Sequence, residues 1–237
     1  MDIAGSVALV TGANRGIGRA FVGELQRRGA AKIYATARNP AQIDSPGVQV
    51  LQLDVTDPQS VTKAAEQASD VTLVISNAGI TANGPLLTGD LDHIRLVMET
   101  NYFGTLNVAR AFAPVLKTNG GGALLTVLSA LAWFSFEGVG PYCASKAAAW
   151  SLTDSIRIEL ASQGTQVTGM YVGPVDTDAM AGIDVPKSAP EDIARITLDG
   201  VEQGFTEVLA DEMTAQIKLT LSDPPDKRYE KALALIS

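Results

Sequence analysis

The stretch "TGANRGIGRA", from Thr11 to Ala20, connects a short apolar run to a helical pattern. Its glycines Gly12, Gly16 and Gly18 fall where a strand would turn into a helix. Glycines there permit a tight turn and let backbone N–H groups approach a pyrophosphate, which the positive end of the helix dipole also favours. A plain turn is the alternative, but the flanking strand and helix are the context that a dinucleotide-binding loop requires. The stretch therefore predicts a dinucleotide site.

Short apolar runs alternate with helical patterns on both sides of this loop and nearly to the end of the chain. The runs are continuously apolar, as expected for strands that are covered on both faces. Strand–helix alternation implies right-handed crossovers and a parallel sheet. We therefore predict an α/β fold, a single-domain Rossmann fold with a doubly wound parallel sheet of about seven strands and helices on both faces. The expected strands are 6–12, 32–36, 48–54, 71–76, 123–129, 166–172 and 206–210, and the expected helices are 16–28, 58–68, 91–116, 142–162 and 190–203.

Composition limits the kinds of partner and compartment. The 237 residues contain no linker, so one domain is expected over 1–237, with 211–237 as an extension packed on the domain or at an oligomer contact. The net charge of −8 and the scattered basic residues argue against nucleic acid. The single cysteine, Cys143, excludes an internal disulfide, and the start of the chain lacks a secretory signal. The uncharged stretch 118–136 is rich in glycine and polar residues and is not expected to cross a membrane. We expect a cytoplasmic protein.

The end of the second expected strand indicates which dinucleotide is bound. An acidic residue about 20 positions after the glycines would hold a ribose 2′-hydroxyl, but Ala37 and Arg38 stand there. A guanidinium forms charge-assisted bonds to a 2′-phosphate, and Arg15 in the glycine loop could supply a second cation. The alternative for each arginine is a solvated surface residue, and for Arg15 taken alone the two readings weigh equally. Together they favour NADP(H) over NAD(H).

Tyr142 and Lys146 stand four residues apart, so on a helix they share one face. A tyrosine with its ordinary pKa of about 10 exchanges protons slowly at neutral pH. A neighbouring ammonium favours the phenolate and brings that pKa closer to the working pH. Ser129 ends the fifth expected strand, at the edge of the sheet that faces the ligand crevice. Its hydroxyl could hydrogen-bond a substrate carbonyl oxygen.

The Thr-Gly-x-x-x-Gly-x-Gly loop and the Ser…Tyr-x-x-x-Lys set resemble the classical short-chain dehydrogenase/reductase family, most closely its carbonyl reductases and ketoreductases. The likeness covers nearly the whole chain. It implies that Tyr142 donates a proton to a carbonyl oxygen while NADPH delivers hydride, and that Ser129 polarises the carbonyl. It implies further that Lys146 holds the nicotinamide ribose and lowers the tyrosine pKa. Asn101 would anchor a water that links Lys146 to solvent, or would satisfy a helix kink near Gly104.

The resemblance also implies a set of cofactor contacts. Several of them have a structural alternative: Asp54 could cap a helix or form a turn ahead of Thr56, and Asn77 and Gly79 could be turn residues. The expected cofactor-binding residues are Gly12, Asn14, Arg15, Gly16, Ile17, Gly18, Arg38, Asp54, Val55, Asn77, Ala78, Gly79, Tyr142, Lys146, Pro174, Val175 and Thr177.

The substrate is expected to be an uncharged, apolar or aromatic ketone or aldehyde, reduced reversibly to an alcohol. Only the short segment 178–189 is available as a lid, which predicts an open site. Leu131, Phe134 and Phe136 suit an apolar substrate pocket, and they suit burial at a subunit contact equally well. Cys143 and the only histidine, His93, are expected to be a packing residue and an ordinary helix residue, and no metal site is predicted.

Two other functions share parts of this pattern. An NADP-sensing regulator without chemistry would keep the fold but lose the tyrosine or the lysine, and both are present. A nucleotide-sugar epimerase or dehydratase would need a larger C-terminal substrate domain than the residues after 210 provide. The family resemblance implies a homodimer or homotetramer, with the helices that begin at Leu91 and Tyr142 at the interface.

Overall fold

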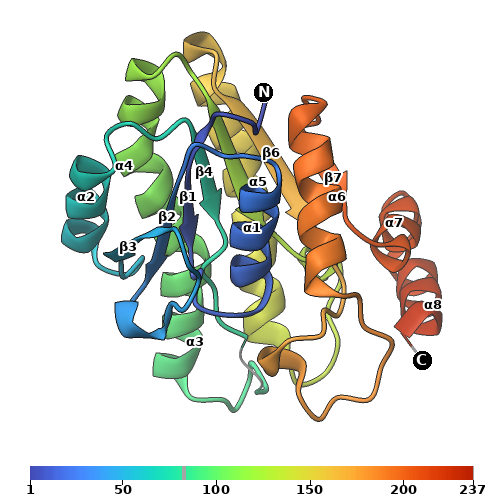
Figure 1. Cartoon of the computed structure of the whole chain (residues 1–237). Coiled ribbons are helices and arrows are strands. Elements are labelled where there is room, and N and C mark those ends of the chain that lie inside the picture. Colours follow the sequence, from blue (N-terminus) through green and yellow to red (C-terminus); the bar gives the residue numbers. More distant parts are fainter. Residues whose placement is uncertain (82–83, 237) are drawn as a thin grey trace.

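A parallel sheet of seven strands lies at the centre of the protein, in the order β3-β2-β1-β4-β5-β6-β7 (Figure 1). The computed structural model describes residues 1–81 and 84–236, so Ala82, Asn83 and Ser237 of the predicted domain 1–237 lie outside the described residues. The predicted fold class is confirmed. The strands are β1 Val7–Thr11, β2 Lys32–Ala37, β3 Gln49–Gln52, β4 Leu73–Ser76, β5 Ala123–Val127, β6 Gln166–Tyr171 and β7 Glu207–Leu209. The helices are α1 Gly16–Arg27, α2 Pro58–Gln67, α3 Leu91–Met98, α4 Gly104–Thr118, α5 Gly140–Leu160, α6 Pro190–Glu202, α7 Glu212–Leu219 and α8 Pro225–Ile236.

Each face of the sheet is covered by its own helices and has its own core. Figure 1 shows α1 and α6 on one face and α4 and α5 on the other. Along β1, Ala8 and Val10 belong to the core under α1 and α6, while Leu9 belongs to the opposite core. Successive side chains of a strand point to opposite faces, so a strand covered on both faces needs an apolar residue at every position. This is why central strands such as β1, β4 and β5 appear in the sequence as nearly continuous apolar runs, whereas the edge strand β3 is mostly exposed.

The strand order places the ligand crevice. From β1 the chain moves outward through β2 and β3, then returns to pair β4 with the other side of β1. In an open parallel sheet, ligands bind beyond the carboxyl ends of the strands where the order reverses. The glycine loop follows β1 and residues 77–80 follow β4, so both border this point.

The predicted helix 91–116 is present, but it is not a uniform α-helix. A π-helical turn, Glu99–Phe103, separates α3 from α4. Such turns insert an extra residue into a helix and occur frequently at functional sites. Asn101 lies inside this turn, and its side chain is directed into the protein, 2% exposed.

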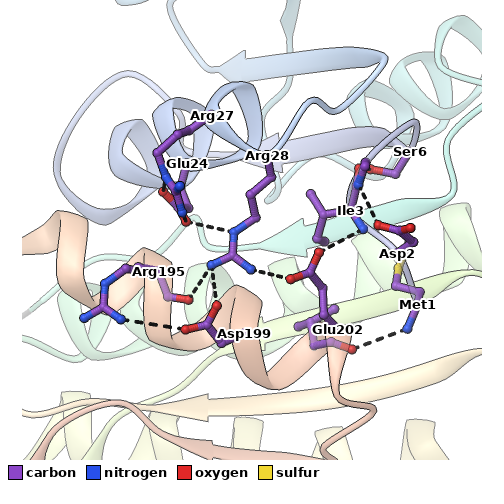
Figure 2. A network of polar contacts seen from close by, with 12 residues as sticks. Met1, Asp2, Ile3, Ser6, Glu24, Arg27, Arg28, Arg195, Asp199 and Glu202 are labelled. Carbon is purple, nitrogen blue, oxygen red and sulfur yellow. Dashed lines mark hydrogen bonds and ion pairs between the residues drawn. The ribbon is translucent and has the colours of Figure 1, made fainter.

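The half-buried cation Arg28 connects the C-terminal end of α1, the helix that follows the glycine loop, to α6 (Figure 2). The guanidinium of Arg28 donates to Glu24 at 2.8 Å, to Asp199 at 2.7 Å and to Glu202 at 2.6 Å. Figure 2 also shows Glu202 reaching the N-terminal segment, where it accepts from the Ile3 N–H at 3.3 Å. Removing one member of such a network leaves the others as uncompensated charges, so it holds α1 firmly in place.

The C-terminal helices α7 and α8 pack against the loop that follows β5. Trp133 and Phe134 of that loop form a third apolar cluster with Ile217 of α7 and Ala232 of α8. The Phe134 and Tyr229 rings meet edge to face with centroids 6.5 Å apart. Residues 211–236 therefore pack beside the carboxyl end of β5. Within the described ranges, every helix is too short or too polar to span a membrane.

Candidate active site

Two glycines of the loop after β1 have backbone angles that favour glycine: φ is +66° at Gly12 and +53° at Gly16. The third glycine is required for space. A Cβ on Gly18 would lie 2.1 Å from the Gly12 carbonyl oxygen and 2.6 Å from Asn77 Nδ2, which no side chain can tolerate. The first turn of α1 can therefore lie directly against the strand ends, with its N–H groups facing the crevice.

Asn77 connects the loop after β4 to the glycine loop. Its Nδ2 donates to the Thr11 carbonyl at 2.8 Å and to the Gly12 carbonyl at 3.3 Å. The backbone N–H groups of Asn77 and Ala78 both donate to Thr11 Oγ1 at 2.9 Å. The side chain of Asn77 is thus engaged in holding the two loops together, and it positions the cleft as well as lining it.

A cleft of about 910 Å³ lies over these loops. A cavity of this size, with a backbone cradle at one end and few side chains above the glycines, fits an extended dinucleotide. The structure brings together at this cleft the predicted residues Gly12, Asn14, Arg15, Gly16, Ile17, Gly18, Arg38, Asp54, Val55, Asn77, Ala78, Gly79 and Thr177. It adds lining residues that were not predicted: Ala37, Asn39, Gln42, Leu53, Thr56, Ile80, Thr100, Asp178 and Ala179.

Gln42 is the clearest of these additions. Its Oε1 accepts from Asn14 Nδ2 at 3.2 Å, which joins the segment after β2 to the glycine loop. A glutamine in an irregular segment gives no sequence signal of its own. Only its position four residues after Arg38, on the same side of the crevice, could have suggested it.

Asp54 lines the cleft and also forms a turn. Its Oδ1 accepts from the Thr56 N–H at 3.0 Å and from the Thr56 hydroxyl at 2.8 Å. The helix-capping alternative is wrong for Asp54, because Asp57 caps α2 by accepting from the Gln59 N–H at 2.9 Å. The turn fixes the Asp54 carboxylate at the cleft wall, so the turn and the ligand-facing position occur together.

Two cations at the cleft have no carboxylate partner. Arg15 and Arg38 are exposed and line the cleft, and neither forms an ion pair within residues 1–81 and 84–236. Arg28, by contrast, is held by three acidic side chains. A guanidinium without a partner keeps its donors available for an anionic ligand.

The four predicted catalytic residues come from three elements and meet beside the cleft. Ser129 follows β5, Tyr142 and Lys146 lie in the first turns of α5, and Asn101 lies in the π-turn. Lys146 is 6% exposed; its Nζ donates to the Val127 carbonyl at 2.9 Å and lies 5.6 Å from the centroid of the Tyr142 ring. A Cβ placed on Gly79 would lie 3.1 Å from Asn101 Oδ1 and 3.8 Å from Lys146 Nζ, so both side chains border that glycine.

Burial sets the protonation of the tyrosine–lysine pair. It raises the pKa of the Tyr142 phenol to about 12, an effect that the neighbouring Ser129 hydroxyl partly opposes. Burial also lowers the pKa of the Lys146 ammonium to about 8. In the protein alone the pKa of Tyr142 therefore shifts upward, because desolvation disfavours the phenolate, and the lowering of this pKa by Lys146 stays a prediction. At neutral pH both groups hold their protons.

Asn101 uses its whole side chain to join two elements. Its Nδ2 donates to the Ile80 carbonyl and to Ser145 Oγ, each at 2.9 Å, and its Oδ1 accepts from the Ile80 N–H at 2.9 Å. The side chain therefore does not satisfy a helix kink at Gly104; it holds the loop after β4 against α5. The water relay through Asn101 stays a prediction.

The segment from Gly173 to Thr177 runs from the end of β6 to the cleft. Thr177 lines the cleft, and its Cγ2 would lie 3.2 Å from a Cβ on Gly16. Ser188 holds the segment from outside, because its N–H donates to the Pro174 carbonyl at 3.0 Å and its carbonyl accepts from the Asp176 N–H at 2.9 Å. Pro174 and Val175 lie next to the cleft wall but outside the set of lining residues.

A family model described as short chain dehydrogenase matches residues 6–187, a span that contains the glycine loop, Asn101, Ser129, Tyr142 and Lys146. The chain belongs to the short-chain dehydrogenase family. It is therefore an oxidoreductase of that family, and the resemblance found in the sequence is confirmed.

Among curated relatives, this short-chain dehydrogenase is 33% identical to 1-deoxy-11-beta-hydroxypentalenate dehydrogenase of Streptomyces exfoliatus, over 81% of the chain and 75% of the relative. It is also 33% identical to the 3-oxoacyl-(acyl-carrier-protein) reductase FabG of Escherichia coli, over 75% of the chain and 77% of the relative. A solved short chain dehydrogenase from Burkholderia cenocepacia, in complex with NADP, is 38% identical with a TM-score of 0.93, over 98% of this chain and 99% of that one.

The residues predicted to form the substrate pocket of this short-chain dehydrogenase differ in how exposed they are in the structure. Phe134 is 4% exposed and packs on Tyr229, so it contributes to the contact with the C-terminal helices. Phe136 is 40% exposed, and Leu131 is half-buried. None of the three lines the dinucleotide cleft among the residues that the structure describes. Phe136 is the one that keeps a surface available to a ligand.

The two remaining reactive side chains lie where packing explains them. Cys143 is buried, and burial raises the pKa of its thiol, which disfavours the nucleophilic thiolate. His93 is exposed on α3. The described part of the chain contains no group of three or more histidine, cysteine or acidic side chains that could hold a metal ion.

Proposed function

We propose that the protein is an NADP(H)-dependent reductase of uncharged ketones or aldehydes. The observation that carries this proposal is the meeting of Ser129, Tyr142 and Lys146 beside a dinucleotide cleft that contains two arginines without carboxylate partners. The first three residues are the groups that carbonyl reduction needs, and the two arginines favour an anion at the far end of the cleft.

The preference for NADP(H) rests on the charges at the cleft. Arg38 stands directly after β2, where a carboxylate would repel a 2′-phosphate, and Arg15 lies in the glycine loop. The Burkholderia cenocepacia relative was solved with NADP at 38% identity. Complexes of related folds with NAD or NADH are only 22% identical and show the fold alone.

The tyrosine is the proton donor in this proposal. With a pKa of about 12 in the protein alone, the Tyr142 phenol is protonated at neutral pH and has a proton to give, but transfer to a carbonyl oxygen requires neighbouring groups that favour the phenolate. Ser129, whose Oγ is fixed by the Leu131 N–H at 3.1 Å, orients that oxygen. When bound, a reduced nicotinamide supplies the hydride. Lys146 would hold the ribose and stabilise the phenolate that remains.

The substrate side of the site favours an apolar molecule. Leu86 packs against the start of α5, where a Cβ on Gly140 would lie 2.7 Å from its Cδ1, two residues before Tyr142. The neighbouring Leu87 is 98% exposed, and Phe136 is 40% exposed. The loops that carry these side chains, after β4 and β5, and the short segment 178–189 gather at one end of the sheet in Figure 1. Apolar side chains at an open entrance suit an apolar or aromatic carbonyl compound.

The proposal includes a homodimer or homotetramer formed through α3, α4 and α5. Leu96, Phe103 and Ile158 are exposed large apolar residues on these helices or on the π-turn between α3 and α4. Exposed large apolar side chains on these elements support association through them. No observation favours a regulator without chemistry, because the catalytic groups are all in place.

The test is oxidation of NADPH, followed by the nicotinamide absorbance, against a panel of uncharged alkyl and aryl ketones and aldehydes. NADH is run in parallel, and the Tyr142→Phe variant reports any contaminating reductase. We expect turnover with NADPH, slower turnover with NADH, and none above background in the variant. Tight NADPH binding without turnover of any carbonyl compound would contradict the proposal.

A further inference from the structure

The carboxylate of Asp211, at the start of α7, holds the backbone that leads to the nicotinamide end of the cleft. Its Oδ2 accepts from the Gly173 N–H at 2.7 Å and from the Thr214 hydroxyl at 2.9 Å. Its Oδ1 accepts from the Thr214 N–H at 2.7 Å. One side chain therefore caps α7 and, with its other oxygen, bonds a residue 38 positions earlier in the chain.

The hydrogen bond from the Gly173 N–H to Asp211 lies just beyond the last backbone hydrogen bond between β6 and the β7 side of the sheet. The last backbone contact between β6 and the β7 side is the Ala210 N–H donating to the Tyr171 carbonyl at 2.9 Å. Beyond it the chain leaves the ladder, and the Gly173 N–H is satisfied by a side chain instead. The first turn of α7 is so near that a Cβ on Gly173 would lie 2.2 Å from Met213 Cε.

The segment that follows Gly173 is held only from its outer side. Ser188 bonds Pro174 and Asp176, as described above, while the Val175 N–H has no acceptor in the described part of the chain. Thr177 then lines the cleft. The Asp211 bond and the two Ser188 bonds thus fix the two ends of a short backbone stretch whose middle N–H is free to bind a ligand.

We propose that Asp211 is a positioning residue for the nicotinamide half of the cofactor, acting through the Gly173 backbone. The inference rests on the proposed function in one respect, namely that a nicotinamide dinucleotide occupies the cleft with its reactive ring at Ser129 and Tyr142. The Ala130 N–H, next to Ser129, donates to the Val172 carbonyl at 3.0 Å, so the segment that begins at Gly173 starts at that end of the cleft. Asp211 itself touches no cleft-lining residue in the contacts described, and it belongs to the C-terminal helices that also hold the loop after Ser129. Losing its bond to Gly173 frees the segment 173–177 without changing Arg15, Arg38 or the glycine loop.

The Asp211→Asn variant separates this role from helix capping. Asparagine caps helices as well as aspartate does, so its oxygen can keep the Thr214 N–H bond. Its amide nitrogen is a donor and cannot accept from the Gly173 N–H. The measurement is calorimetric binding of two ligands: NADP⁺, and adenosine 2′,5′-bisphosphate, which lacks the nicotinamide half. We expect the affinity for NADP⁺ to fall by about tenfold, because binding must then order a backbone segment that Asp211 no longer holds, with no change for the bisphosphate.

Thr214→Val is the matched control. It removes the hydroxyl that donates to Asp211 Oδ2 but leaves the Gly173 bond, so it should lower the melting temperature and leave both affinities unchanged. Equal weakening of both ligands by Asp211→Asn, or no weakening of NADP⁺, would overturn the inference. If the wild-type protein binds NAD⁺ instead and ignores the bisphosphate, the proposed NADP(H) preference fails. The same comparison with NAD⁺ and 5′-AMP then decides the role of Asp211.

Discussion

The loop after β1 and the loop after β5 border the same edge of the sheet, but they are built in opposite ways. The loop after β1 binds its ligand through backbone groups, because the space at Gly18 admits no Cβ. Arg15 and Arg38 line the same cleft and form no ion pair with the residues that the structure describes. The loop after β5 is held by large side chains. Trp133 stacks on Tyr171 with centroids 4.5 Å apart, and Lys218 Nζ lies 4.9 Å from the Trp133 ring.

The difference follows from what each loop has to recognise. A pyrophosphate is the same in every dinucleotide, so backbone N–H groups and a helix N-terminus suffice to bind it. These groups lie within one short stretch of chain. A substrate pocket needs a particular shape, which here depends on packing between segments far apart in sequence. The comparison teaches that the glycine loop owes its shape mainly to residues adjacent in the chain, whereas the loop after β5 is shaped by the distant C-terminal helices.

The largest expected effect comes from Gly18→Ala. The new Cβ would lie 2.1 Å from the Gly12 carbonyl oxygen, so α1 must move away from the strand ends and cofactor binding should be lost. Gly23→Ala in the same helix is the control, because nothing lies within 4 Å of its Cβ. We expect the control to raise stability by up to about 1 kcal/mol. Calorimetric binding of NADP⁺ and thermal melting of both variants check this, and retained binding in Gly18→Ala would break the comparison.

Lys146→Met should abolish turnover and stabilise the fold. The pKa of Lys146 is lowered from 10.5 to about 8, so burying its charge costs about 3 kcal/mol at pH 7. The lost bond to the Val127 carbonyl offsets about 1 kcal/mol of the gain. Because the unfolded chain holds the lysine proton longer than the folded protein, wild-type stability should rise between pH 8 and 10.5, and the advantage of the variant should disappear there. Urea unfolding of the wild-type and variant proteins between pH 7 and 10.5 measures the rise in wild-type stability and the difference between the two proteins. A variant less stable than the wild type at pH 7 would contradict the burial of the charge.

Arg38→Asp should reverse the cofactor preference. The new carboxylate repels a 2′-phosphate and can accept from a ribose 2′-hydroxyl, so kcat/KM with NADPH relative to NADH should fall by about 10- to 100-fold. Arg19→Asp changes the charge equally, but Arg19 does not line the cleft. An equal change in the Arg19 variant would mean that overall charge, and not contact at Arg38, decides the preference.

Tyr229→Phe should give the smallest effect, and it tests how α8 supports the loop after β5. It removes the hydroxyl that accepts from the Ser135 N–H at 3.0 Å and keeps the ring against Phe134. We expect a loss of about 0.5–1 kcal/mol in unfolding free energy. The KM for the carbonyl substrate should rise while NADP⁺ affinity stays the same, which is the reverse of Asp211→Asn. A change in cofactor affinity alone would show that α8 does not act on the substrate side.

The features that could be predicted from the sequence are those that depend on residues close together in the chain. Most of the strands were recognisable because parallel strands with two buried faces are apolar throughout, and the glycine loop carries its function in adjacent residues. The edge strand β3 is the exception, because its residues Gln49–Gln52 are mostly exposed. Helical spacing puts Tyr142 and Lys146 on one face, and the resemblance to the family gave the pair its role. These predictions needed no knowledge of contacts between distant segments.

What escaped prediction depends on distant contacts. The π-turn around Asn101 has no composition of its own, and the burial of Phe134 is produced by Tyr229, 95 positions later. Asp211 has the pattern of an ordinary helix cap, and only the fold brings it to Gly173. The upward shift of the Tyr142 pKa in the protein alone was not predicted, because spacing shows the neighbouring charge but not the desolvation.

The most direct test of the central claim, that Tyr142 is the proton donor, is a single turnover of bound NADPH followed by its absorbance in the wild-type and Tyr142→Phe proteins. The substrate is the best carbonyl compound of the panel. We expect the variant to bind NADPH with wild-type affinity and to oxidise it about 10²- to 10⁴-fold more slowly, the range for loss of a general acid. Oxidation at the wild-type rate in the variant would contradict the claim, and the proton donor would have to be sought elsewhere at the site.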